Sequence, residues 1–157
     1  MNLFGVMESS GSAMQAERIR AEVVATNMAN AETTRTQSGE PYRRQMVVFM
    51  AGNGDTNTAA DSLPIQTRLP TNWTFGNQDS SSGVRIAGVF EDTGEPMKRF
   101  DPGHPDAGAD GYVSYPNINP LTEMVDLMGA TRAYGLNGSA VQAEKNMIGS
   151  ALEIAKA

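Results

Sequence analysis

The residues of this chain that could do chemistry gather in one short stretch. His104 is the only histidine, and it lies close in sequence to Asp101, Asp106 and Asp110. Such groups can bind a metal ion, but a strong site usually offers more than one nitrogen or sulfur donor. Two prolines and a glycine within residues 101–106 predict a stiff turn instead. We therefore predict that these side chains cap backbone groups of the turn or face water, and that the chain binds no metal.

No other stretch offers a catalytic arrangement. Paired acidic residues such as Glu91 and Asp92 are expected by chance in an acidic region, and nothing marks them for acid–base work. Ser9, Ser10 and Ser12 have no base nearby, and without cysteine there is neither a thiolate nor a disulfide framework. The sequence therefore predicts no catalytic residue and no cofactor, and a protein that is not an enzyme.

The net charge of −6 is unevenly placed along the 157 residues. Residues 51–119 carry nine acidic and four basic side chains, whereas residues 1–50 are balanced and residues 120–157 carry a net charge of −1. An acidic chain without a basic stripe is not expected to bind nucleic acid. No apolar run approaches the ~18 residues of a membrane span, so we expect no membrane insertion.

The longest predicted element is the last one, a helix over residues 119–157. Asn119 is a favourable N-cap, and Pro120 suits the first helical position. One set of every-seventh positions is apolar throughout and predicts a coiled-coil seam. Its members are Leu127, Tyr134, Val141, Ile148 and Ala155. A second set is mixed and includes Met124 and Leu152. A helix of this length would reach roughly 57 Å and needs a partner along it.

That partner is expected at the other end of the chain, in a helix over residues 3–30. Met7, Met14, Ala21 and Met28 are spaced by seven residues. We predict an α+β fold whose two terminal helices form an antiparallel coiled-coil domain, made of residues 1–35 and 119–157. Residues 36–118 are expected to form a small β-rich domain with a polar loop at 51–83. Within it, the pattern predicts strands at 42–50 and 111–115 and a hairpin of 84–90 with 97–100.

Several stretches resemble the flagellar rod and hook axial proteins. Residues 25–31, Ala-Thr-Asn-Met-Ala-Asn-Ala, match an N-terminal signature of that family, and Pro-Tyr-Arg-Arg-Gln follows at 41–45. Residues 99–107 and 111–119 are similar to segments typical of one rod member. Glu123-Met124 and residues 131–134 extend the match into the last helix. The resemblance covers roughly residues 3–50 and 84–157.

The resemblance implies a structural subunit that polymerises with other rod proteins into the drive shaft between motor and hook. It implies assembly in the periplasm at the inner-membrane ring, after export through the flagellar export apparatus. Export without a cleaved leader is expected, because the N-terminus has no signal-peptide pattern. The implied partners are other rod subunits, further copies of this chain, the inner-membrane ring and the export apparatus.

We predict that one set of side chains carries subunit packing: Met7, Met14, Met28, Asn27, Asn30, Met124, Leu127, Tyr134, Val141, Ile148 and Leu152. Two other classes of protein stay open at this point. One is a soluble periplasmic coiled-coil adaptor, and the other is a hydrolase associated with the cell wall. A nucleophile–base pair or a metal constellation would favour the hydrolase, and polymerisation with rod subunits would exclude the adaptor.

Overall fold

The computed structural model describes residues 3–52 and 83–156, and it confirms the predicted α+β class. Its elements, in chain order, are α1 (Leu3–Ala29), β1 (Gln45–Ala51), β2 (Val84–Glu91), β3 (Met97–Phe100), β4 (Tyr112–Tyr115) and α2 (Pro120–Lys156). Most of the polar loop predicted at 51–83 lies outside the described residues.

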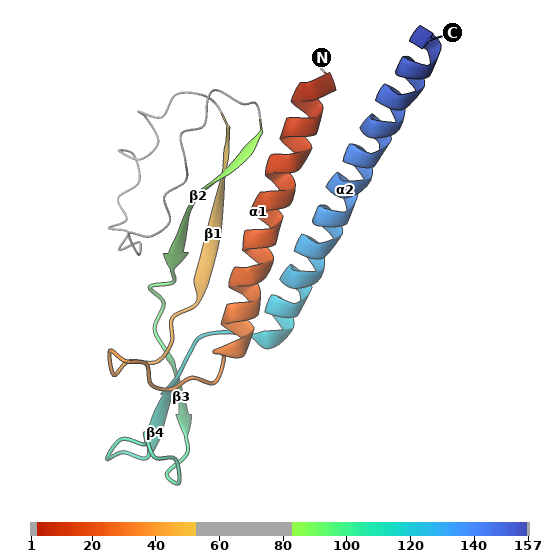
Figure 1. Cartoon of the computed structure of the whole chain (residues 1–157). Helices are drawn as coiled ribbons and strands as arrows, with labels where there is room; N and C mark the ends of the chain where they lie inside the picture. Colours follow the sequence, from red (N-terminus) through yellow and green to blue (C-terminus); the bar gives the residue numbers. More distant parts are fainter. Residues whose placement is uncertain (1–2, 53–82, 157) are drawn as a thin grey trace.

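The two terminal helices lie side by side and run in opposite directions (Figure 1). α1 contacts α2 on one side and the strands β1 and β2 on another. The antiparallel arrangement expected of the two chain ends is therefore present. The division into a domain of residues 1–35 and 119–157 and a domain of residues 36–118 stays a prediction.

Local chemistry explains where the helices begin and end. At the start of α2, the Asn119 side-chain oxygen accepts the Leu121 N–H at 3.0 Å, as the predicted N-cap requires. At the end of α1, the Asn30 N–H is shared between the carbonyls of Thr26 and Asn27. α2 is continuous although four glycines lie inside it, at 129, 135, 138 and 149. Each costs about 1 kcal/mol relative to alanine, so α2 depends on packing for its stability.

The strands form two separate antiparallel pairs, β1 with β2 and β3 with β4. The predicted hairpin of residues 84–90 with 97–100 is therefore wrong. β2 instead buries Gly88 and Phe90, whereas every residue of β3 is exposed. Residues 92–96 form no tight turn and contain Pro96, so β3 is carried away from β2 to its partner β4. The register of β1 and β2 shifts between Val48 and Phe49.

The apolar core is thin. Only six hydrophobic residues of the described chain are buried, and they are Ala16, Val24, Phe90, Val113, Ile118 and Ala130. Two of the six are alanines, which bury little apolar area. The helices must therefore be positioned by something besides an apolar core.

Candidate functional site: a buried polar cluster and an exposed helix face

Asn27 is the centre of a buried polar cluster. Its side-chain amide donates to the Gln45 carbonyl at 2.8 Å and to Glu123 Oε2 at 3.1 Å. Its side-chain oxygen accepts the Gln45 N–H at 2.9 Å and the Tyr42 hydroxyl at 3.2 Å. Asn27 is fully buried, and this arrangement uses both donors and both acceptor positions of its side chain. The Asn27 side chain therefore bonds both the N–H and the carbonyl of Gln45, the first residue of β1, as the backbone of a neighbouring strand would.

Glu123 extends the cluster into the first turn of α2. Its side chain is 1% exposed, and its Oε1 accepts a hydrogen bond from Arg44 Nε at 2.6 Å. Arg44 also lies 3.6 Å from Asp126, which in turn pairs with Arg20 of α1 at 3.3 Å. Breaking one partner of a buried ion pair typically costs 3–5 kcal/mol, because it leaves an uncompensated charge. The cluster therefore ties α1, β1 and α2 together at one end of the helix pair.

Tyr42 lies at the edge of this cluster. Partial burial raises the pKa of the Tyr42 hydroxyl above its ordinary value of 10.0, and the negative charges of Glu91 and Glu123 raise that pKa further. The neutral hydroxyl is the form that can donate to Asn27, so the environment favours the state that completes the cluster.

The cluster assembles residues from three separate stretches of the sequence. Asn27, the segment 42–45 and Glu123 all belong to the motifs that resemble rod proteins. Sequence reasoning assigned only Asn27 to the site. The segment 42–45 and Glu123 could have been suspected because they belong to the same set of motifs. Their spacing in the sequence, however, does not show that they contact Asn27. The subunit contact predicted for Asn27 stays a prediction, but its amide already has its partners inside the chain.

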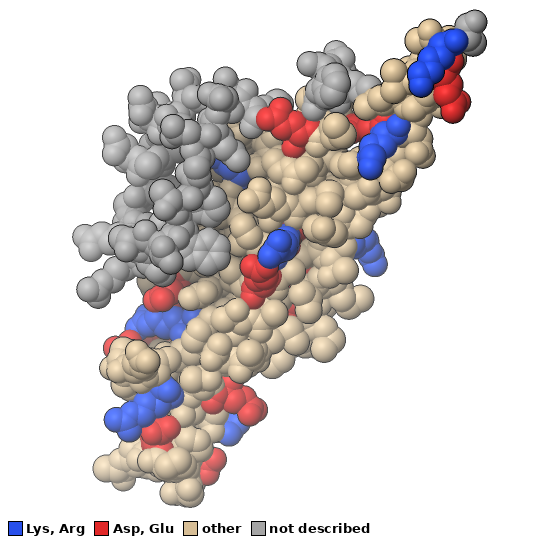
Figure 2. Space-filling view, viewed as in Figure 1, with Lys and Arg blue, Asp and Glu red and all other residues tan. Residues whose placement is uncertain are grey.

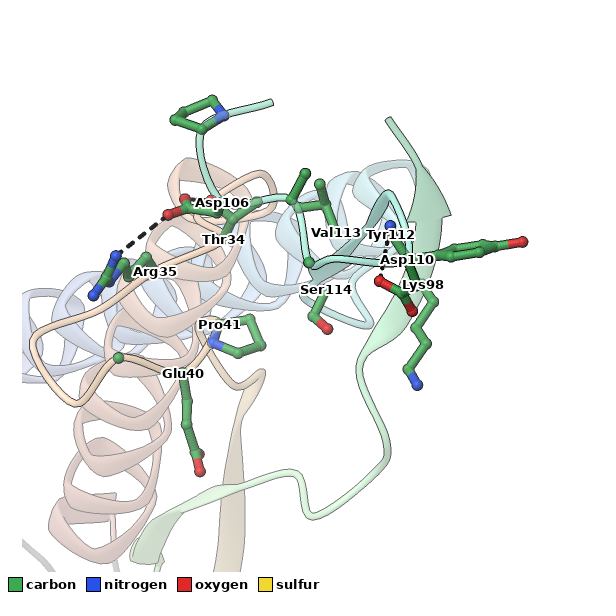
Figure 3. Close-up of a pocket in the computed structure, with 14 residues that line it drawn as sticks. Thr34, Arg35, Glu40, Pro41, Lys98, Asp106, Asp110, Tyr112, Val113 and Ser114 are labelled. Atoms are coloured by element: carbon green, nitrogen blue, oxygen red, sulfur yellow. Dashed lines mark hydrogen bonds and ion pairs between the residues drawn. The ribbon is translucent and has the colours of Figure 1, made fainter. Parts of the chain in front are cut away.

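A polar pocket lies beside the cluster, between the loop that follows α1 and the loop that joins β3 to β4 (Figure 3). Its volume is about 570 Å³. Asp106 holds the two loops together, because it accepts the Thr34 hydroxyl at 2.7 Å and lies 3.6 Å from Arg35. Lys98 and Asp110 line the other end of the pocket. Charges of both signs share the wall, so the pocket has no single electrostatic preference.

His104 has a structural partner in the turn between β3 and β4. Its Nδ1 accepts the Asp106 N–H at 3.1 Å, and the His104 N–H donates to the Asp101 carbonyl. This backbone capping is what the turn interpretation predicts. Within residues 3–52 and 83–156, no group of three or more His, Cys, Asp or Glu side chains could hold a metal ion. The absence of a metal role for His104 stays a prediction.

The side of α2 that faces α1 mixes acidic, small and apolar residues. Glu123, Ala130 and Glu144 are its buried positions, and they are multiples of seven residues apart. This spacing is that of a helix seam, but two of its three members are acidic. The sequence analysis looked for apolar residues at this spacing, so it did not identify these three buried positions.

The predicted packing residues occupy varied positions. Met7, Met14, Met28, Asn30, Leu127, Val141 and Ile148 are half-buried, and Tyr134, Met124 and Leu152 are exposed. Coiled-coil packing is therefore not established by this single chain. Exposed members remain available to another subunit, so their predicted role is untested rather than contradicted.

The outer side of α2 carries an apolar stripe that sequence reasoning did not identify. Its large members, all more than half exposed, are Leu121, Val125, Met128, Leu136, Met147 and Ile154. Successive members lie on one side of the helix, because their spacings follow its 3.6-residue period. We call this set the outer stripe. Figure 2 shows charged side chains scattered over the helix pair, with uncharged surface between them. No described helix combines the length and apolar character needed to cross a membrane.

Two family models match this chain. The family model described as "Flagella basal body rod protein" matches residues 7–36, in α1 and the loop after it. The model described as "Flagellar basal body rod FlgEFG protein C-terminal" matches residues 109–154, which hold β4 and most of α2. The two elements joined by the polar cluster are thus those that define flagellar rod proteins as a class.

Individual relatives show to which family of rod proteins the chain belongs. A protein of Bacillus subtilis is 38% identical over 99% of this chain and 100% of its own length. Relatives from Borreliella burgdorferi and Salmonella typhimurium are 33% and 32% identical, over 98% and 94% of this chain and the same shares of their own lengths. Each is named flagellar basal-body rod protein FlgC. The chain belongs to the FlgC family of flagellar basal-body rod proteins. It is a structural subunit of the rod.

Proposed function

We propose that the helix pair is the layer through which this rod subunit packs against its neighbours, and that the outer stripe of α2 is the main contact. The β-containing middle then forms an outer layer of the rod. In this arrangement the helices form the inner tube by coiled-coil contacts between subunits. The assembled shaft transmits torque from the motor to the hook.

The position of the large apolar residues of α2 carries this proposal. Leu136 is 66% exposed and Ile154 is 78% exposed, whereas the side facing α1 buries Glu123 and Glu144. Burying one such aliphatic side chain fully is worth about 1.5–3 kcal/mol. A contiguous exposed apolar surface usually marks an interface. A helix that leaves so many of its large apolar side chains exposed is therefore suited to a polymer.

The thin core supports a further part of the proposal. We infer that the subunit passes the flagellar export apparatus as an unfolded chain and folds in the periplasm at the inner-membrane ring. A chain with few buried apolar residues has little free energy of unfolding to overcome before export. Ordering on assembly then supplies the stability that the single chain lacks.

Replacing Leu136 with Glu tests the proposal. The substitution places a charge in the outer stripe, and burying that charge between subunits is costly. We expect loss of intact basal bodies by electron microscopy, with normal export and a normal circular dichroism spectrum of the purified chain. Gln142→Glu is the matched control, because Gln142 is exposed on the same helix and lies outside the stripe. Normal assembly with Leu136→Glu would show that the outer stripe is not an interface.

A further inference from the structure

We propose that Met128 and Met147 form an oxidation site on α2, and that oxidation of these two methionines prevents a free subunit from joining the rod. The oxidant is a peroxide, which converts each thioether into a sulfoxide before the subunit assembles. The inference rests on the proposed function, because it takes the outer stripe to be buried between subunits. It adds a chemical modification that acts on the same surface.

The exposure of the methionines supplies the first observation. Met128 is 60% exposed and Met147 is 55% exposed, and both belong to the outer stripe. The methionines of α1, by contrast, are half-buried, and they are Met7, Met14 and Met28. The susceptibility of a sulfur atom to oxidation follows its exposure to solvent. A dissolved oxidant therefore reaches the outer stripe before it reaches the methionines of α1.

The sulfur content of the chain supplies the second observation. Oxidants attack the sulfur of cysteine and of methionine, and this chain has ten methionines and no cysteine. The lone pair of the thioether sulfur attacks one peroxide oxygen, so that a sulfur–oxygen bond forms and the oxygen–oxygen bond breaks. The departing hydroxide takes the proton from the transferred oxygen and leaves as water. Methionine thus loses two electrons and the peroxide gains them.

The surroundings of the two methionines decide what a sulfoxide does. Met128 lies between Val125 and Leu136 along the outer stripe. Met147 lies between Leu136 and Ile154. In the single chain the sulfoxide oxygen faces water, which can donate a hydrogen bond to it. In a buried apolar contact this water is lost, and a polar group without a partner is unfavourable. Oxidation therefore weakens assembly and leaves the fold of the single chain unchanged.

The same burial protects subunits that are already in place. Once a neighbour covers the outer stripe, peroxide no longer reaches the two sulfur atoms. The modification thus distinguishes free subunits from assembled ones and keeps an oxidised subunit out of the shaft. The sulfoxide is reversible, because methionine sulfoxide reductases restore the thioether.

Mass spectrometry of the purified chain tests the selectivity of the site. After treatment with hydrogen peroxide, the sulfoxide content of each methionine is followed with time. Met128 and Met147 are expected to oxidise at least fivefold faster than Met14 and Met28. In isolated basal bodies the rate at Met128 and Met147 should fall at least fivefold. Equal rates along the chain, or unchanged rates in basal bodies, would overturn the proposal.

A variant without the two thioethers tests the effect on assembly. The cells carry the chain as their only copy of this rod protein, and they build new basal bodies in a sublethal concentration of hydrogen peroxide. The pair Met128→Leu and Met147→Leu keeps the apolar volume and removes the oxidisable sulfur. Peroxide should lower the number of basal bodies at least threefold in wild type and less than 1.5-fold in the leucine pair. Equal losses in the two strains would overturn the proposal.

A polar substitution reproduces the modified state without an oxidant. The pair Met128→Gln and Met147→Gln is expected to lower the number of basal bodies at least fivefold. Met97→Gln is the matched control, because Met97 is 57% exposed but lies on β3, outside the outer stripe, and it should stay within twofold of wild type. Normal assembly of the glutamine pair would overturn the proposal. If that pair alters the circular dichroism spectrum of the purified chain, the comparison of wild type with the leucine pair decides.

Leu136→Glu separates this inference from the proposed function. If Leu136→Glu blocks assembly while peroxide affects wild type and the leucine pair equally, the oxidation site is rejected and the interface is kept. If Leu136→Glu assembles normally, both the interface and the oxidation site are rejected.

Discussion

Replacing Asn27 with Ala should destabilise the single chain more than any other change in its motif. The substitution removes four hydrogen bonds, to both backbone groups of Gln45, to Tyr42 and to Glu123. Gln45 and Tyr42 are only half-buried and can partly exchange their lost bonds for water. Glu123 keeps Arg44 but loses its second donor in a site that is 1% exposed.

The expected loss follows from these partners. A buried polar group left without a partner costs about 1–3 kcal/mol, and roughly two such groups remain after partial hydration, so about 3 kcal/mol is expected. Small proteins have a free energy of unfolding of only about 5–15 kcal/mol. Asn27→Ala should therefore shift the urea midpoint of the purified chain strongly, as followed by circular dichroism.

Asn30 offers a matched control from the same motif. Its side chain donates only to the Thr26 carbonyl in an exposed bond and accepts the Thr33 hydroxyl. Asn30→Ala should change the free energy of unfolding by less than about 1 kcal/mol. Asn27→Asp should be at least as damaging as Asn27→Ala, because it sets a second carboxylate against Glu123. Equal small losses for Asn27→Ala and Asn30→Ala would refute the view that the cluster positions the helices.

Two further predictions concern the single chain. Tyr42→Phe should cost about 1 kcal/mol near neutral pH. Because the pKa of Tyr42 is raised on folding, its stabilising contribution is complete below pH 10.0 and is lost as the pH rises through the folded-state pKa. Urea unfolding of Tyr42→Phe should therefore show a shallower alkaline loss than wild type, and equal slopes would contradict this. Gly135→Ala should stabilise the chain by about 1 kcal/mol, since apart from the adjacent residues and the helix's own backbone no described atom lies within 4 Å of the added methyl group. A lower melting temperature of Gly135→Ala would contradict the expected stabilisation. A higher melting temperature together with fewer basal bodies would show that a neighbouring subunit approaches this position closely.

The terminal helices could be predicted because their signals are local. The absence of proline before Pro41, the Asn119 cap and the seven-residue spacings all depend on neighbouring residues. The pairing of β2 could not be predicted in the same way. Residues 92–96 resemble a turn, but β2 pairs with β1, lies against α1 and buries Phe90, whereas β3 is exposed throughout. Nonlocal packing outweighed the local hairpin that the sequence pattern predicted.

The buried residues of the candidate site also could not all be predicted from local sequence patterns. Heptad spacing identified Leu127 and Ile148, which the structure leaves half-buried, but it missed the fully buried acidic members of the inner side. Pattern reasoning assumes that buried means apolar. That assumption fails for Glu123, because its cost of burial is offset by Asn27 and Arg44, two residues distant in sequence. Only a structure shows such compensation.

The distribution of polar and apolar residues on α2 also explains why the subunit needs its neighbours. α2 buries two acidic side chains on the side towards α1 and leaves nine large apolar side chains exposed, so it gains little from pairing alone, and four glycines weaken it further. The ordered end is held by the Asn27 cluster, whereas every residue from Gly149 to Lys156 is exposed. Stability along the helix pair should therefore fall from the cluster towards the free end of α2. Neighbours that cover the outer stripe would add most where the single chain is weakest. Under the proposed function, polymerisation would complete the folding of each subunit as well as build the shaft.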